Sequence, residues 1–238
     1  GSAVHEVLES LSVLPKQTRF SESLITKFEK VWAKVSGKNG GFTNGDLEHK
    51  YKTRGQDMLR RVMNNPGHLV NPAVKIQMDL PQFWLSEEDS IMLCGKVDWL
   101  EYLHDTDSVH IIDFKTGKTE EDPASLQLSI YLLLVNHCQK YKVSRASYWY
   151  LDSSDVLTPK ELPDLEIARK NILDAARQVK LARQLERFKC PQGDGCFTCR
   201  PMEAIINHEA EFVGNDEYNY DVYILNKAGS ENRDGLIL

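Results

Sequence analysis

The chain has 238 residues, enough to bury one substantial core, and its 41% hydrophobic and 27% charged residues are ordinary for a globular protein. A formal net charge of −6 argues against a basic protein that coats nucleic acid, although a basic groove can coexist with acidic flanks. The chain shows no signal peptide, no apolar run of membrane-spanning length and an odd set of five cysteines, so we expect a cytoplasmic (intracellular) protein without membrane contact.

The N-terminal half predicts mainly helices. We interpret residues 1–18 as a tag remnant and N-terminal extension, because Gly1-Ser2-Ala3 resembles a cloning scar. Apolar residues at helical spacing predict helices over 19–35, with Ser21 as N-cap, and over 46–63. Alternating apolar and polar residues predict a half-buried strand over 74–80.

The C-terminal half alternates between strand and helix patterns. In chain order we expect a strand region over 91–103 interrupted at Gly95, a buried strand over 109–114, a helix over 124–138, a strand over 146–151, a long helix over 165–188 and a strand over 221–226. This order predicts an α/β domain in which a central mixed β-sheet is flanked by helices, with a helical N-terminal portion.

Two aspartates lie inside apolar strand patterns, Asp98 in Gly-Lys-Val-Asp and Asp113 in Ile-Asp-Phe-Lys-Thr-Gly. If the two strands pair, the carboxylates come close together, and a divalent cation such as Mg²⁺ resolves their repulsion. Lys115 lies two residues beyond Asp113 and points to the same face, where an ammonium can orient water or stabilise phosphate charge. Alone, either motif is equally compatible with a strand end or a solvated hairpin.

Gln127 and Tyr131 lie four residues apart in an otherwise apolar helix and so share one face. Either they are core residues whose polar groups form hydrogen bonds inside the protein, or they are part of the same site. The segments GKVDWLEYL, HIIDFKTGK and SLQLSIYLLL resemble the RecB-like and CRISPR-associated exonuclease branch of the PD-(D/E)XK nuclease superfamily. All three motifs of that family occur in the family's order.

The resemblance implies a restriction-endonuclease-like core over residues 19–206, followed by a C-terminal extension over 207–238. It implies that Asp98, Asp113 and the Phe114 main-chain carbonyl bind Mg²⁺ or Mn²⁺, and that Lys115 acts on the attacking water. Gln127 and Tyr131 would line the site, and Lys118 would contact a phosphate.

The chain also departs from the family pattern. The family's histidine, four residues after a helix glycine, would fall at Leu59 if that glycine is Gly55, and the preceding strand offers Lys75 and Gln77 where relatives often have glutamate. These differences argue against a full two-metal site. They are compatible with a one-metal enzyme or with weakened activity.

The cysteine segment near the end of the chain suggests a second metal site. Relatives often hold an iron–sulfur cluster there, but two of its four cysteine positions are missing, so we expect no conventional [4Fe–4S] cluster. Two alternatives stay open. Cys190, Cys196, Cys199 and His208 bind Zn²⁺, or the cysteines are an unligated relic of the cluster.

The helix over 165–188 is rich in Arg and Lys, among them Arg177 and Lys180, which could line a DNA channel. A solvated face interleaved with acidic residues is the alternative, and we slightly favour it.

We therefore expect a Mg²⁺- or Mn²⁺-dependent deoxyribonuclease that acts on single-stranded or free-ended DNA in repair, recombination or defence. It would work alone or with a helicase or recombination partner. The alternative is a nuclease-like module, weak or inactive in catalysis, that binds DNA or protein within a larger helicase-nuclease assembly.

Overall fold

The computed structural model describes residues 1–188, 192–193, 196, 199–216 and 219–225. Its elements, in chain order, are α1 (Ser2–Glu9), η1 (Ser10–Val13), α2 (Leu24–Trp32), η2 (Gly37–Gly40), α3 (Gly45–Asn64), η3 (Gly67–Val70), β1 (Gln82–Ser86), β2 (Ile91–Cys94), β3 (Trp99–Leu103), β4 (Ser108–Lys115), α4 (Gln127–Cys138), β5 (Lys142–Tyr150), β6 (Thr158–Lys160), α5 (Leu165–Gln184), α6 (Arg200–Ile206), β7 (Ala210–Asn215) and β8 (Asp221–Leu225).

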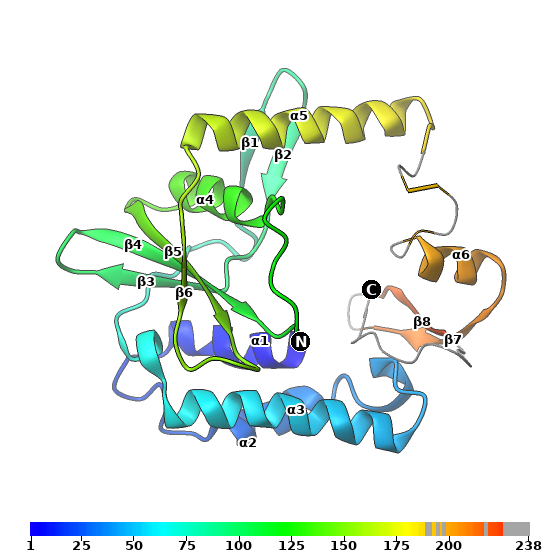
Figure 1. Ribbon diagram of the computed structural model, residues 1–238, viewed down its shortest axis with the longest axis horizontal. Helices are drawn as coiled ribbons and strands as arrows, with labels where there is room; N and C mark the ends of the chain where they lie inside the picture. Colours follow the sequence, from blue (N-terminus) through cyan, green and yellow to red (C-terminus); the bar gives the residue numbers. More distant parts are fainter. Residues whose placement is uncertain (189–191, 194–195, 197–198, 217–218, 226–238) are drawn as a thin grey trace.

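The central sheet has four strands in the order β3-β4-β5-β6 (Figure 1). β4 runs antiparallel to β3 and parallel to β5, and β6 returns antiparallel to β5, so the sheet is mixed. The parallel pair is joined through α4, the crossover that parallel strands require. The predicted fold class, a mixed sheet flanked by helices, is confirmed.

Helices cover both faces of this sheet, and alternate residues of each strand pack toward opposite layers. On one face Trp99, Ile112 and Phe114 pack with the N-terminal helices α1, α2 and α3. On the other face Leu100 and Ile111 pack with α4, and α5 packs outside α4 (Figure 1). Every residue of β4 except Lys115 is buried, which agrees with its β-branched, apolar composition.

The N-terminus folds differently from the prediction. Residues 2–9 form α1, whose residues Ala3, Val4, Val7 and Leu8 are buried in the core beneath the sheet. The helix predicted over 19–35 begins later, at Leu24, with Ser23 rather than Ser21 as the N-cap. Arg19 is held outside the helix because its buried guanidinium binds main-chain carbonyls of Leu11 and Asn71. The helix predicted over 46–63 is confirmed as α3.

The strand predicted over 74–80 is wrong. Only two ladder-like hydrogen bonds tie this region to β3, from Val74 N to Leu100 O and from Tyr102 N to Pro72 O. After Val74 the backbone turns away from the edge of the sheet, and it forms no strand up to Pro81. Proline lacks the N–H that a ladder needs, so Pro72 and Pro81 limit the pairing at both ends.

Several boundaries also shift. The interruption at Gly95 is confirmed, since β2 ends at Cys94 and β3 begins at Trp99. β1 was not predicted, and it pairs with β2 as a separate hairpin. α4 begins at Gln127 rather than near residue 124, and α5 ends at Gln184 because Glu186 adopts a positive φ of 50°.

The last described segments are α6 and the β7–β8 hairpin, drawn to the right of the main sheet in Figure 1. The predicted terminal strand is confirmed as β8, whereas α6 and β7 were not predicted. An ion pair of 2.6 Å joins Glu211 of β7 to Lys38 of η2. Among the described residues, no helix is both long and apolar enough to span a membrane.

Candidate active site

The two predicted aspartates meet where β3 begins and β4 ends. Asp98 directly precedes β3, and its Oδ2 accepts a hydrogen bond of 2.7 Å from the main-chain N–H of Phe114. That bond fixes the Asp98 carboxylate beside the strand that carries Asp113. The two residues are only 9% and 2% exposed, so both carboxylates lie in a largely water-excluded region.

The surroundings of Asp113 disfavour its negatively charged form. Burial, and then the charge of Asp98, raises its pKa to about 6. Lys115 Nζ lies 2.9 Å from the buried Oδ2 of Asp113 as an ion-pair partner, although no donor reaches this oxygen with regular hydrogen-bond geometry among the described residues. A buried carboxylate beside a second carboxylate fits a cation ligand, because a divalent ion would offset the repulsion between the two negative charges.

His5, which was not predicted as a site residue, lies beside the two aspartates. Its Nδ1 lies 3.4 Å from Asp98 Oδ2, and its ring packs edge-on against Phe114 at 6.1 Å between centroids. The negative charges of Asp98, Glu9 and Asp113 together outweigh burial and raise the pKa of His5. Counting from Gly55 to Leu59 therefore did not find this histidine, which the structure places beside Asp98.

The signal for His5 was present at the start of the chain, where Gly1 precedes His5 by four residues. Treating residues 1–18 as an extension hid it. A Cβ on Gly1 would lie 3.1 Å from Thr116 Oγ1, so α1 approaches the end of β4 closely at this position. Gly55 has another role, since a Cβ there would lie 2.8 Å from Phe28, and its absence lets α3 pack against α2.

Glu9 adds a third carboxylate. It lies one helical turn after His5, and the ligand atoms of His5, Glu9 and Asp98 all fall within 4.8 Å of one another. Burial and the nearby charge of Asp98 raise the pKa of Glu9. This acidic residue comes from α1 and not from the region of Lys75 and Gln77, where the comparison with the family pattern looked for one.

Lys115 extends from the end of β4 into a cage of acceptors. Its Nζ lies 2.7 Å from Glu121 Oε2, donates to Gln127 Oε1, and sits 4.8 Å from the centroid of the Tyr148 ring. Burial alone would lower the pKa of Lys115, but Glu121 and Asp113 together raise it. Lys115 is therefore an ammonium in the resting protein.

Gln127 and Tyr131 lie together at this site, as their spacing predicted. Gln127 Nε2 donates to the Tyr131 hydroxyl at 3.0 Å, so the chain of contacts runs from Lys115 through Gln127 to Tyr131. Burial, with the charges of Asp98 and Asp113, raises the pKa of Tyr131. Tyr131 therefore stays a neutral hydroxyl that can donate a hydrogen bond.

The residues predicted to contact DNA have different surroundings. Lys118 lies in the loop after β4. Arg177 and Lys180 lie on α5, and both bind Asp89 of the β1–β2 turn, Arg177 Nη2 at 2.7 Å from its carboxylate and Lys180 at its main-chain carbonyl. Both cations thus tie the β1–β2 hairpin to α5. Their role in DNA binding, like that of the Phe114 carbonyl in metal binding, stays a prediction.

The cysteine segment is only partly described. Cys199 is the N-cap residue of α6, Cys196 accepts its N–H through the main chain, and His208 follows the helix with a φ of 60°. Cys190 lies outside the described residues. The zinc site and the unligated relic therefore both stay predictions.

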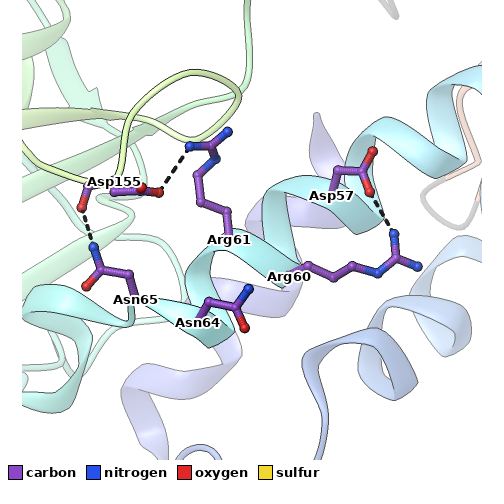
Figure 2. Close-up of a pocket in the computed structure, with 6 residues that line it drawn as sticks. All are labelled: Asp57, Arg60, Arg61, Asn64, Asn65 and Asp155. Carbon is purple, nitrogen blue, oxygen red and sulfur yellow. Dashed lines mark hydrogen bonds and ion pairs between the residues drawn. The ribbon is translucent and has the colours of Figure 1, made fainter.

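Two surface pockets lie away from the aspartates. One, of about 340 Å³, lies at the end of α3, where Arg60 pairs with Asp57 at 2.7 Å and Arg61 with Asp155 at 3.1 Å (Figure 2). The other, of about 650 Å³, is lined in part by His68 and His110. Neither of these two pockets is lined by Asp98, Asp113 or Lys115.

Comparison with known proteins agrees with this geometry. The family model of the PD-(D/E)XK nuclease superfamily matches residues 1–203, which include α1 with His5, both aspartates and Lys115. A search of curated proteins finds no match. Because the family model covers most of the chain and the buried carboxylates with their lysine lie together, the chain belongs to the PD-(D/E)XK nuclease superfamily.

Proposed function

We propose that this protein is a Mg²⁺- or Mn²⁺-dependent deoxyribonuclease that hydrolyses phosphodiester bonds from single-stranded or free-ended DNA. The observation that carries the proposal is the pair of buried carboxylates, Asp98 and Asp113, beside the Lys115 ammonium. Family membership supports the reaction class. The substrate preference rests on the resemblance of GKVDWLEYL, HIIDFKTGK and SLQLSIYLLL to RecB-like exonucleases.

The residues of the site divide the work by charge. Asp98 and Asp113, with His5 and Glu9 beside them, would hold the cation, since hard divalent ions prefer carboxylate oxygens. The cation would stabilise the negative charge that develops on the phosphate during hydrolysis. The Phe114 N–H holds the Asp98 carboxylate in place.

Lys115 contributes as a hydrogen-bond donor. Because its pKa is raised, it orients the attacking water or stabilises phosphate oxygens, and it does not take a proton in the resting state. Glu121 and Gln127 position its ammonium. Tyr131, held by Gln127, extends the polar surface toward the nucleic acid.

The proposal includes a setting in DNA repair, recombination or defence, with a helicase or recombination protein as partner. It rests on the resemblance to the nuclease domains of helicase-nucleases.

The test is digestion of end-labelled single-stranded DNA, duplex DNA and RNA with Mg²⁺ or Mn²⁺. Variants Asp113→Asn, Lys115→Ala and His5→Ala probe the site, and Asp105→Asn, an exposed aspartate in the β3–β4 turn, is the matched control. We expect metal-dependent cleavage of DNA that is lost in the three site variants and kept in Asp105→Asn. Loss of labelled ends before internal cuts appear would support an exonuclease.

Cleavage that persists in Asp113→Asn, or that needs no metal, would overturn the proposal. A wild-type protein that binds DNA but leaves all substrates intact would favour the alternative, a binding module with a nuclease fold.

A further inference from the structure

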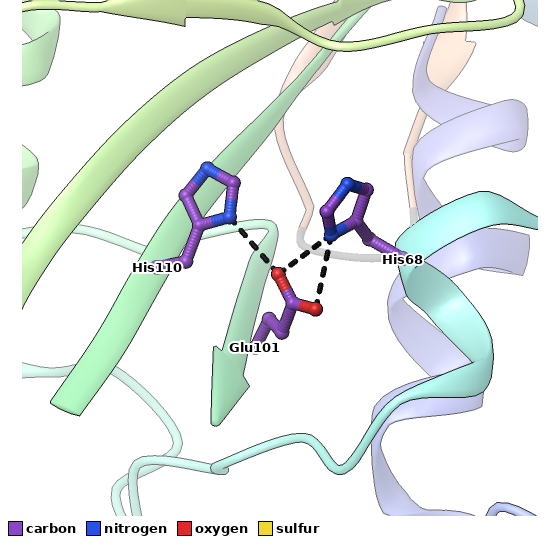
Figure 3. Close-up of side chains that lie close together, drawn as sticks. All are labelled: His68, Glu101 and His110. Atoms are coloured by element: carbon purple, nitrogen blue, oxygen red, sulfur yellow. Dashed lines mark hydrogen bonds and ion pairs between the residues drawn. The ribbon is translucent and has the colours of Figure 1, made fainter. Parts of the chain in front are cut away.

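A second cluster of potential metal ligands lies on the opposite face of the sheet from Asp113. Glu101 of β3 and His110 of β4 are paired directly across the two antiparallel strands, so both side chains leave the sheet on the same face as Trp99 and Ile112. His68 reaches them from η3 (Figure 3). The catalytic residues on β4, Asp113 and Lys115, alternate to the other face.

The three side chains converge on one point. The Nδ1 atoms of His68 and His110 lie 2.8 Å and 2.9 Å from Oε2 of Glu101, and the three ligand atoms all fall within 4.8 Å of one another. Figure 3 shows both rings turned toward this carboxylate. Two imidazole nitrogens and one carboxylate oxygen are a donor set suited to Zn²⁺ and related transition metals rather than to Mg²⁺.

Surrounding contacts hold each ligand in place. The second nitrogen of His110, Nε2, lies 2.9 Å from Ser147 Oγ on β5, and Asn71 binds the other oxygen of Glu101. Arg19 fixes the segment that carries His68 by binding the carbonyls of Leu69 and Asn71 from its buried position. Metal-binding histidines characteristically have such a partner on the ring nitrogen that faces away from the metal.

The cluster is also accessible from solvent. His68 and His110 line the pocket of about 650 Å³, and the His68 side chain is 42% exposed, whereas Glu101 is 2% exposed. A cation can therefore enter from the pocket and keep a water or an anion as a fourth ligand. Arg145 and Lys160, with Glu161, line the same pocket.

We propose that His68, Glu101 and His110 bind a transition-metal ion of the Zn²⁺ class, through the Nδ1 atoms of both histidines and a carboxylate oxygen of Glu101. In tetrahedral zinc sites the ligand atoms are about 3.3 Å apart, so each Nδ1 needs to move away from Glu101 Oε2 by only roughly half an ångström. The ring protons move from Nδ1 to Nε2, and Ser147 then accepts the hydrogen bond from His110. The ion would tie η3 to β3 and β4.

The experiment is a titration of the full chain with Co²⁺, whose visible absorption reports nitrogen and oxygen coordination, followed by displacement with Zn²⁺. The parent protein for this titration carries Asp113→Asn, Cys196→Ser and Cys199→Ser, so that Co²⁺ bound at the active site or the cysteine segment contributes less to the absorption. His68→Gln tests the cluster, and His49→Gln, an exposed histidine on α3, is the matched control.

We expect His68→Gln to lose one equivalent of Co²⁺, or to bind it at least about tenfold more weakly, and His49→Gln to match the parent protein. Ser147→Ala should weaken binding by about 10- to 100-fold through the loss of the partner of His110. Equal stoichiometry and affinity in the parent protein and in His68→Gln would overturn the proposal.

A measurement on the wild-type chain avoids dependence on any variant's folding. In ¹⁵N-labelled protein, Zn²⁺ should shift the Nδ1 resonances of both His68 and His110 and leave His49 unchanged. If neither Nδ1 resonance responds to Zn²⁺, the cluster is a hydrogen-bond network only and the proposal fails.

Discussion

Two buried acids on neighbouring strands, Asp113 and Glu101, experience opposite surroundings. Burial, and then the charge of the neighbouring Asp98, raises the pKa of Asp113 to about 6, although Lys115 partly offsets the rise. Burial alone would also raise the pKa of Glu101, but hydrogen bonds from His110, Asn71 and His68 together lower it. Burial acts in the same direction on both acids, and the difference between them comes from a repelling carboxylate beside Asp113 and from three hydrogen-bond donors around Glu101.

The two candidate metal sites also differ in chemistry. The active site is rich in carboxylates that repel one another, and it gains from any hard cation. At Glu101 the histidines already satisfy the acid, so an incoming ion must displace their protons from Nδ1. We therefore expect the second site to prefer metals that bind imidazole strongly.

The largest expected effect is on catalysis. Asp113→Asn removes a charge that the cation and the reaction need, so nuclease activity should fall by about 10³-fold or more, equivalent to about 4 kcal/mol. Glu101→Gln, measured below its unfolding temperature, should keep activity within about threefold, since it lies on the other face. A comparable loss of activity in both variants would mean that the two faces are not independent.

The next largest effect is on stability at Glu101. Glu101→Gln leaves His68 and His110 facing a neutral amide in a buried position, so we expect the free energy of unfolding to fall by about 2–4 kcal/mol. Urea denaturation at pH 7 measures this, with the exposed Glu87→Gln as control. Equal stability of the two variants would show that the hydrogen bonds to Glu101 contribute nothing net.

In metal-free protein, Asp113→Asn should raise the free energy of unfolding, the opposite of the effect expected for Glu101→Gln. The pKa of Asp113 is higher in the folded than in the unfolded state, so its ionisation destabilises the fold, and this effect grows as pH rises from about 4 to about 6. At pH 7 we expect the asparagine variant to be more stable by roughly 1–3 kcal/mol. The gain should vanish below pH 4, and a loss of stability at pH 7 would contradict the prediction.

The smallest effect is stabilisation by Mg²⁺. At ten times its dissociation constant, Mg²⁺ should stabilise the wild-type protein by about 1.4 kcal/mol, because it binds only the folded state. The melting temperature should respond in wild type and in His68→Gln but not in Asp113→Asn. If Mg²⁺ raised the melting temperature of the wild type but not of His68→Gln, Mg²⁺ would bind at His68 on the opposite face of the sheet from Asp113.

That Asp98, Asp113 and Lys115 lie together could be predicted from sequence because these parts of the candidate site are local. Asp98, Asp113 and Lys115 lie in two short segments on strands that are consecutive in the chain, and an antiparallel pair brings such segments together without other information. Gln127 and Tyr131 followed from helical spacing. The same local patterns predicted β4, α3 and most of the fold class.

Only the tertiary structure decided which distant segments complete the two sites. His5 reaches Asp98 because α1 packs beneath the sheet, and His68 reaches Glu101 because Arg19 binds the carbonyls of Leu69 and Asn71, which follow it in the chain. The strand predicted over 74–80 failed for a related reason: its alternating pattern was present, but only Ala73 forms a β-bridge to the neighbouring strand. Periodicity describes how a segment can bury one face, whereas long-range packing determines what that face meets.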